Sequence, residues 1–258
     1  KFPDAPEEFG FFASVEKMAI YKPEGNGPFP ALVLLHTCGP IKEQHFRYWV
    51  KQSLDRGYVA FVVDSLEQRG LANGFCQSVP EGFLPGPVRS RDAFEALDHL
   101  GKFAFVDSSR VGAMGFSFGG RVVYLVTGKG VADIFSPGGK RFVAGVALYG
   151  QCFNRELGIN YIRSNLDRPL LALLGDQDSD GDPAECVPRL QAERDKGAPV
   201  EWHVFPATGH AWDNPLFRPP RRISQVGNND VLYAYDADVT ERSRDRAFAF
   251  LDRHLKGK

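Results

Sequence analysis

Residues 110–123 read RVGAMGFSFGGRVV. An apolar run typical of a buried strand leads to Ser117, and a helix-like segment follows it. A strand, a serine with a glycine two residues away on each side, and a helix together form the nucleophile-elbow pattern G-x-S-x-G. Gly115 and Gly119 are required because a Cβ at either position would strike the neighbouring strand or helix. The pattern predicts a hydroxyl held clear of the sheet edge, with the backbone N–H of Phe118 pointing to where an oxyanion would form.

A second oxyanion donor is expected at the end of an earlier strand. Residues 31–35 are continuously apolar, as in a strand covered on both faces, and they lead into HTCGP at 36–40. A loop that leaves a central strand with a glycine can turn a backbone N–H inward. An ordinary turn at the end of a strand is an equally weighted alternative for this segment.

Segments with strand patterns alternate with segments of helical periodicity along the chain. The predicted strands are 9–21 (in which a hairpin is an alternative), 31–35, 58–63, 107–116, 142–149, 169–174 and 200–205, and the predicted helices are 43–56, 89–103, 120–127, 183–196 and 238–255. This alternation predicts an α/β fold with a mostly parallel, doubly wound sheet of about eight strands flanked by helices. No G-x-G-x-x-G follows the first strand, so a dinucleotide site is not expected.

Length and composition favour one large core. The chain has 258 residues, of which 43% are hydrophobic and 24% are charged, so we expect residues 1–258 to form one domain with a loose lead-in at 1–8. A formal net charge of −1 gives no field that would favour nucleic acid or an anionic membrane. No apolar run approaches the roughly 20 residues of a membrane span. The sequence shows no signal-peptide pattern, and we expect a mature or trimmed form.

A serine hydroxyl needs a base within hydrogen-bond reach, and the base needs an acid that fixes its tautomer. In a parallel sheet all strands end at one edge, so both partners are expected just after strand ends, in the order serine, acid, histidine. His210 meets this condition, because it follows the predicted strand 200–205. Asp178 is the preferred acid and Asp176 the runner-up. Asp180 and Asp182 are expected to be solvated loop charges.

The other histidines have structural interpretations. The ring of His36 is expected to brace the loop that carries the second oxyanion donor. The remaining histidines are expected at a helix start (His45), on helix surfaces (His99 and His254) and packed within a strand (His203). No two histidines stand four apart on a helix, and the Asp run at 176–182 lacks the spacing and terminal Glu of a calcium loop. We therefore expect no metal site, and no cofactor is implied.

Four residues near predicted strand ends are candidates for the substrate pocket: Gln68, Arg69, Phe116 and Trp212. Arg69 could meet a carboxylate on the substrate, but a surface arginine or a pair with Glu67 is an equally weighted alternative. Residues 212–238 are long for a connection and carry three prolines. They either fold over the pocket mouth or, as we favour, form a solvated excursion.

The chain has four cysteines, Cys38, Cys76, Cys152 and Cys186. None belongs to a C-x-x-C pair, which argues against a zinc ribbon or a thioredoxin-like site. The even count is compatible with two disulfides in an oxidising compartment. Four reduced, buried thiols in a cytosolic enzyme are an equally weighted interpretation.

Five motifs within residues 32–213 together resemble α/β-hydrolases of the dienelactone-hydrolase-like family: LVLLHTCGP, GYVAFVVDS with QRG after it, RVGAMGFSFGG, LLGDQDSDGDP and FPATGHAWD. The resemblance implies a Ser117, Asp178 and His210 triad with backbone oxyanion donors at Phe118 and Cys38. Founding members of that family use cysteine as the nucleophile, whereas this chain has serine. The acidic and arginine residues that bind a dienelactone carboxylate are not plainly matched. This departure favours a general carboxylic-ester hydrolase over an enzyme for dienelactone itself.

The resemblance is closest to a branch with cysteines at these same four places. It implies the disulfides Cys152–Cys186 and Cys38–Cys76, which would tie loops at the carboxyl edge of the sheet. It also favours a periplasmic or secreted location, with a cytoplasmic location as the alternative.

These observations predict a serine hydrolase that cleaves small-molecule carboxylic esters through an acyl-enzyme. One alternative is a serine peptidase or amidase on the same fold. Another is a binding module that keeps the fold without catalysis. The natural substrate, its acyl length and alcohol group, and the oligomeric state stay open.

Overall fold

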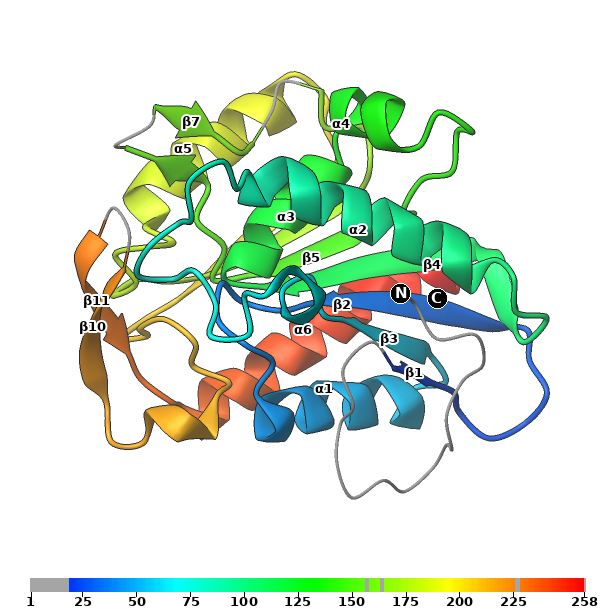
Figure 1. The fold of residues 1–258 in the computed structure, drawn as a ribbon, viewed down its shortest axis with the longest axis horizontal. Helices are drawn as coiled ribbons and strands as arrows, with labels where there is room; N and C mark the ends of the chain where they lie inside the picture. Colours follow the sequence, from blue (N-terminus) through cyan, green and yellow to red (C-terminus); the bar gives the residue numbers. More distant parts are fainter. Residues whose placement is uncertain (1–18, 156–157, 163–164, 226–227, 258) are drawn as a thin grey trace.

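The structure, a computed structural model, describes residues 19–257 apart from 156–157, 163–164 and 226–227 (Figure 1). Its main sheet has seven strands in the order β1-β3-β2-β4-β5-β8-β9. In chain order these are β1 (Ile20–Tyr21), β2 (Phe29–Leu35), β3 (Val59–Val63), β4 (Val106–Phe116), β5 (Gly145–Leu148), β8 (Leu170–Gly175) and β9 (Val200–Phe205). In this sheet β1 is antiparallel to β3, and every other neighbouring pair is parallel. The predicted mostly parallel α/β sheet is confirmed, with seven described strands where the sequence predicts about eight.

Helices cover both faces of this sheet. The described helices are α1 (Glu43–Asp55), α2 (Pro85–Leu100), α3 (Phe118–Val126), α4 (Lys129–Phe135), α5 (Pro183–Asp195) and α6 (Ala237–Leu255). Helices α1 and α6 lie below the sheet in Figure 1, and α2 and α3 lie above it. None of these helices, within the described residues, has the length and apolar character needed to cross a membrane.

Strand β2 shows why the sequences of the central strands are unbroken apolar runs. Val33 and Leu35 belong to the core cluster that includes residues of α2 and α3. Leu32 and Leu34 belong to the cluster that includes residues of α1 and α6. Because successive side chains of a strand point to opposite faces, both sets of positions must be apolar when helices cover both faces.

Some elements differ from the predicted ones. Helix α2 begins at Pro85 rather than residue 89, because proline is well tolerated in the first turn, where its missing N–H has no helical partner. The short helix α4, which follows Gly128, is not among the predicted helices. Residues 9–18 of the first predicted strand lie outside the described residues.

Two small hairpins were also not predicted. One joins β6 (Phe153–Asn154) to β7 (Ile159–Asn160), and the other joins β10 (Arg221–Gln225) to β11 (Asn228–Tyr233). The second hairpin lies at the left end of the molecule in Figure 1, beside the carboxyl ends of the sheet strands. It lies within the long connection that precedes α6.

Candidate active site

Ser117 lies in the sharp turn between β4 and α3. Its backbone angles are φ 53° and ψ −113°, a strained conformation for a residue that is not glycine. A Cβ on Gly115 would lie 2.1 Å from the carbonyl oxygen of Gly119. A Cβ on Gly119 would lie 2.0 Å from the carbonyl oxygen of Leu35. The steric role predicted for the two glycines is therefore confirmed.

Three side chains from separate strand ends meet at this turn. The Nε2 atom of His210 lies 2.9 Å from the Oγ atom of Ser117. The Nδ1 atom of His210 lies 2.8 Å from the Oδ2 atom of Asp178. All three residues are buried. They come together because β4, β8 and β9 are parallel and end at the same edge of the sheet.

Electrostatics fix the proton arrangement in this chain of bonds. Burial alone would lower the pKa of His210, but the Asp178 carboxylate outweighs it, so the pKa is raised above its ordinary value of 6.5. An ionised carboxylate only accepts hydrogen bonds, so Nδ1 of His210 carries a proton and donates it to Asp178. In the neutral ring the lone pair is then on Nε2, which faces the Ser117 hydroxyl. That is the arrangement a general base requires.

The neighbouring aspartates have other partners. The Asp176 carboxylate accepts a hydrogen bond from the Thr208 N–H at 3.1 Å. Asp180, which the sequence predicts as a solvated charge, is instead buried between Arg121 and Gln151. That prediction is wrong because the partner cation comes from α3, far away in the chain. Asp182 caps the start of α5, where its side chain accepts the N–H of Ala184.

A buried arginine sets the direction of the loop after β2. Arg89 of α2 donates to the carbonyl oxygens of His36 at 2.5 Å and Thr37 at 2.9 Å. Burial lowers the pKa of Arg89 to about 9, so the guanidinium stays charged at neutral pH. In a trans peptide the C=O of one residue and the N–H of the next point in opposite directions. Holding the Thr37 carbonyl therefore turns the N–H of Cys38 away from Arg89.

His36 braces the same loop, as the sequence predicts. The backbone N–H of Ser65 donates to Nε2 of the His36 ring at 3.2 Å. Nδ1 must then carry the ring proton, which it donates to the carbonyl oxygen of Gly39 at 3.0 Å. The loop is thus tied to both α2 and the segment after β3.

The structure forms two disulfides, Cys38–Cys76 and Cys152–Cys186, the pairs that the resemblance implies. The first ties the loop after β2 to the long segment before α2. The second ties the segment after β5 to α5. Both lie near the carboxyl edge of the sheet.

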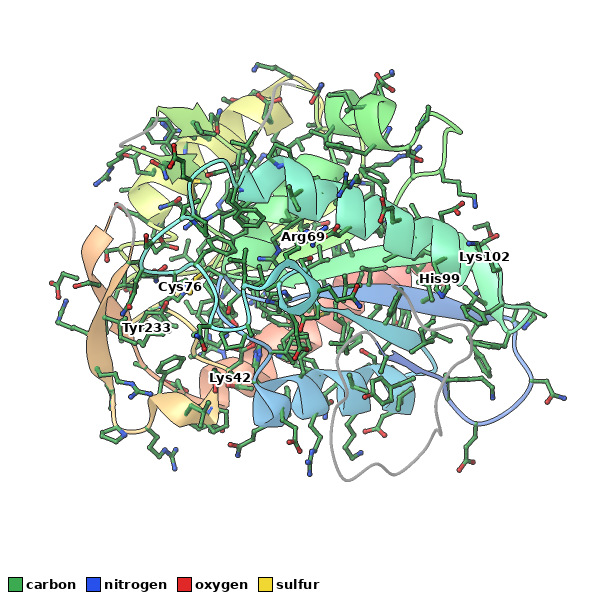
Figure 2. All side chains as sticks on the ribbon, viewed as in Figure 1. Lys42, Arg69, Cys76, His99, Lys102 and Tyr233 are labelled. Atoms are coloured by element: carbon green, nitrogen blue, oxygen red, sulfur yellow. A yellow bond between two sulfur atoms is a disulfide. The ribbon has the colours of Figure 1, made fainter. Side chains whose placement is uncertain are left out.

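Two cavities adjoin the triad. One, of about 470 Å³, is lined by Phe118 and is called the Phe118 cavity. The other, of about 610 Å³, is lined by His210 and is called the His210 cavity. The residues common to both walls are Cys38, Phe75, Cys76 and Gln225. Figure 2 labels three residues of the His210 cavity, Lys42, Cys76 and Tyr233.

The four residues predicted to line the pocket line neither cavity: Gln68, Arg69, Phe116 and Trp212. Arg69 instead forms an ion pair with Asp92, with contacts of 2.6 and 2.8 Å, and not the alternative pair with Glu67. Phe116 and Trp212 are fully buried in the core beneath the site. Gln68 is an exposed residue of the short turn after β3.

Residues 212–238 differ from the solvated excursion that we favour from the sequence. Phe217, Ile223 and Tyr233 from this segment line the His210 cavity. The backbone N–H of His210 also donates to the carbonyl oxygen of Leu232 at 2.6 Å. The segment therefore forms a wall of the site, because its hairpin pairs with the strand-exit loop that carries His210.

Comparison with known proteins agrees with this geometry. A model of the Dienelactone hydrolase family matches residues 17–255, nearly the whole chain. The chain belongs to the dienelactone hydrolase family. A protein of Escherichia coli (strain K12) with the provisional name carboxymethylenebutenolidase is 27% identical over 208 residues, which cover 76% of this chain and 72% of that protein.

Solved structures similar to this family member share its fold. A provisionally named dienelactone hydrolase from Klebsiella pneumoniae has a TM-score of 0.66 and 22% identity, with 91% of each chain covered. A thermophilic esterase from Thermogutta terrifontis with propionate bound has a TM-score of 0.64 and 16% identity, covering 90% of this chain and 87% of that one. At these identities the likeness shows the α/β-hydrolase fold.

This dienelactone hydrolase family member also has a buried network that the sequence did not reveal. Asp213 accepts hydrogen bonds from His45 at 2.9 Å, Trp49 at 2.7 Å and Tyr149 at 2.7 Å. Burial would raise the pKa of Asp213, but these three donors hold it below its ordinary value. The GHAWD motif contains Asp213, but His45 and Trp49 lie in α1, 168 and 164 residues away, and Tyr149 follows β5, 64 residues away, so no sequence spacing could indicate them. Within the described residues, no cluster of three or more His, Cys, Asp or Glu side chains could hold a metal ion.

Proposed function

We propose that this protein is a serine hydrolase that cleaves carboxylic esters through an acyl-enzyme. The observation that carries the proposal is the buried chain of hydrogen bonds from Ser117 through His210 to Asp178, with 2.9 and 2.8 Å between the bonded atoms. Such a chain activates a hydroxyl that would otherwise be a poor nucleophile at neutral pH. Two cavities beside it provide room for the two sides of an ester.

The reaction would begin when the Ser117 hydroxyl attacks the ester carbonyl and its proton moves to Nε2 of His210. Asp178 stabilises the imidazolium that forms. The alkoxide leaves as an alcohol after taking that proton from Nε2. Water then attacks the acyl-enzyme with His210 again as the base, and the carboxylic acid and the free hydroxyl are released.

Two backbone donors would hold the oxyanion of each tetrahedral intermediate. Phe118 is the first residue of α3, where backbone N–H groups have no partner within the helix. Cys38 supplies the second N–H, whose direction Arg89 fixes through the Thr37 carbonyl. Each such donor contributes about 3 kcal/mol to the stability of the transition state.

The nucleophile distinguishes this chain from an enzyme for dienelactone. Serine stands at position 117, and Arg69, the arginine considered for a substrate carboxylate, is paired with Asp92. Both features favour esters without a required carboxylate. The two disulfides favour an oxidising compartment, the periplasm or the exterior of the cell, as the place of action.

Hydrolysis of p-nitrophenyl esters and of p-nitroanilides tests the proposal. We expect the wild-type chain to hydrolyse p-nitrophenyl acetate, and Ser117→Ala to lower kcat by about 10⁶-fold. Faster hydrolysis of the anilides than of the esters would identify an amidase. Absence of both activities from the folded wild-type protein would favour the non-catalytic binding module.

A further inference from the structure

The two cavities are lined by different neighbours of the reacting hydroxyl. Phe118, which directly follows Ser117, lines the first cavity. His210, which bonds to the Ser117 hydroxyl, lines the second. The cavities share the wall at Cys38, the residue whose N–H is assigned to the oxyanion.

The path of the proton assigns a side of the ester to each cavity. The departing oxygen takes its proton from Nε2 of His210, so the alcohol group must lie on the His210 side. The oxyanion points to the backbone donors, and the acyl group takes the remaining direction. We propose that the Phe118 cavity is the acyl pocket and that it selects esters of uncharged, apolar acids longer than acetate. This inference rests on the proposed ester hydrolysis.

The walls of the Phe118 cavity have the chemistry that such an acyl group requires. Apolar side chains from four segments line it, including Val79, Phe83, Leu84, Leu125 and Ile159. Its volume of about 470 Å³ lies within the range of small-molecule sites. Each methylene moved from water into such a wall is expected to raise kcat/KM about fourfold.

The exposed apolar side chains of the molecule gather at these cavities. Four large hydrophobic side chains are exposed in the described part of the chain, and three of them line a cavity. Leu84 is 64% exposed and Val79 is 39% exposed, and both line the Phe118 cavity. Leu216, at 46%, lines the His210 cavity. Exposed apolar surface collected at a site indicates an apolar ligand.

The charged side chain that lines the Phe118 cavity, Arg121, already has an anionic partner. Arg121 is buried and lies 3.2 Å from the Asp180 carboxylate. Its guanidinium also lies 4.9 Å from the ring centre of Phe118 and 5.6 Å from that of Tyr161. A second carboxylate on the acyl group would compete with Asp180 for this cation. The cavity therefore favours an uncharged acyl chain.

The His210 cavity has a more polar wall. Lys42, Asn73, Gln77, Asn214 and Arg221 all line it. An alcohol group with further hydroxyl or anionic groups would find hydrogen-bond partners there, beside the apolar side chains of Leu216, Phe217 and Ile223. Because the two walls differ, substitutions in each cavity can test which one holds the acyl group and which one holds the alcohol group.

Three isoleucine-to-tryptophan substitutions separate the two sides. Ile159→Trp fills the Phe118 cavity, and Ile223→Trp fills the His210 cavity. Ile134→Trp is the matched control, because Ile134 is exposed on α4 and lines neither cavity. Leu84→Trp is a second variant of the Phe118 cavity at an exposed position, which reports if Ile159→Trp fails to fold.

The readout is the ratio of kcat/KM for p-nitrophenyl octanoate to that for p-nitrophenyl acetate. We expect wild type and Ile134→Trp to prefer octanoate by at least about tenfold, and Ile159→Trp and Leu84→Trp to lose most of that preference. Ile223→Trp is expected to keep the preference for octanoate over acetate. It should instead lower the ratio of kcat/KM for benzyl acetate to kcat/KM for methyl acetate. A p-nitrophenyl hemiester of octanedioic acid is expected to react more slowly than octanoate.

Several results would overturn the acyl pocket while leaving the esterase intact. Hydrolysis could depend on Ser117 while its octanoate-to-acetate ratio falls in Ile223→Trp and not in Ile159→Trp. That result would reverse the assignment of the acyl and alcohol sides to the two cavities. A preference for the hemiester over octanoate would contradict the uncharged acyl chain. A folded wild-type protein that hydrolyses none of these esters would contradict the proposed function together with this inference.

Discussion

Two buried pairs of histidine and aspartate contact the same tyrosine in this molecule. In one, His210 bonds to Asp178 through Nδ1 and to Ser117 through Nε2. In the other, His45 bonds to Asp213 through Nε2. The Tyr149 ring packs edge-on against His210 with 4.9 Å between ring centres, and its hydroxyl donates to Asp213.

The difference between the pairs lies in what surrounds them. The Asp213 carboxylate accepts three side-chain hydrogen bonds, and the His45 ring packs edge-on against Phe46 and Phe116. His45 is not among the residues that line either cavity, whereas His210 is. A histidine–aspartate pair thus becomes a candidate for catalysis when its second ring nitrogen faces a hydroxyl beside a cavity. Otherwise the pair contributes to packing.

Replacing the two histidines gives the largest expected contrast. His210→Gln should lower kcat for ester hydrolysis by about 10⁴-fold or more, because the hydroxyl loses its base. His45→Gln should keep kcat within about tenfold and lower the thermal midpoint, because it disturbs a buried network without touching the nucleophile. Steady-state kinetics and thermal unfolding of both variants measure the contrast. Equal losses of activity in the two folded variants would contradict it.

Replacing the two aspartates separates rate from stability. Asp178→Asn should lower kcat by about 10⁴-fold, because the amide no longer favours the tautomer with the proton on Nδ1. Asp213→Asn should cost about 3 kcal/mol in the free energy of unfolding, since it leaves buried donors poorly matched. Urea unfolding gives the free energy of unfolding of each variant, and steady-state kinetics at a temperature where both variants are folded gives kcat. An Asp213→Asn variant as stable as wild type would show that the network is not structural.

The two pairs should respond to pH with opposite signs. The pKa of His210 is raised, so kcat/KM should fall on the acid side with a midpoint above pH 6.5, and Asp178→Asn should move that midpoint down. The stability from this pair is fully present below pH 6.5 and is lost as pH rises through the raised pKa. The pKa of Asp213 is lowered, so its contribution is present above pH 3.8 and is lost as pH falls through the lowered value.

A pH–rate profile and urea unfolding across the same range measure both responses. An acid limb with its midpoint below pH 6.5 in wild type would contradict the influence assigned to Asp178. If Asp178→Asn leaves the midpoint of the acid limb unchanged, that result would also contradict the influence assigned to Asp178.

The smallest expected effect comes from the hydroxyl that connects the pairs. Tyr149→Phe removes one of the three donors to Asp213 and keeps the ring against His210. We expect a loss of about 1 kcal/mol in the free energy of unfolding, with kcat within about threefold of wild type. A loss of kcat as large as that of Asp178→Asn would mean that the two pairs act as one catalytic unit.

The sequence predicts the sheet well because the central strands are buried on both faces, which leaves long apolar runs. It also predicts the positions of Ser117, Asp178 and His210, since parallel strands must end at one edge. The pocket prediction fails at Phe116, because successive side chains on a strand alternate, and this one points into the core with α1. Arg89 and the Asp213 network depend on contacts between distant segments, which no local pattern reveals.

Labelling with a fluorophosphonate, followed by peptide mass spectrometry, tests the central claim most directly, because the reagent reacts only with an activated hydroxyl. We predict one adduct per chain, on the peptide that contains Ser117, absent from Ser117→Ala and formed far more slowly in His210→Gln than in His45→Gln. An adduct at another residue, or none on the folded wild-type protein, would contradict the account.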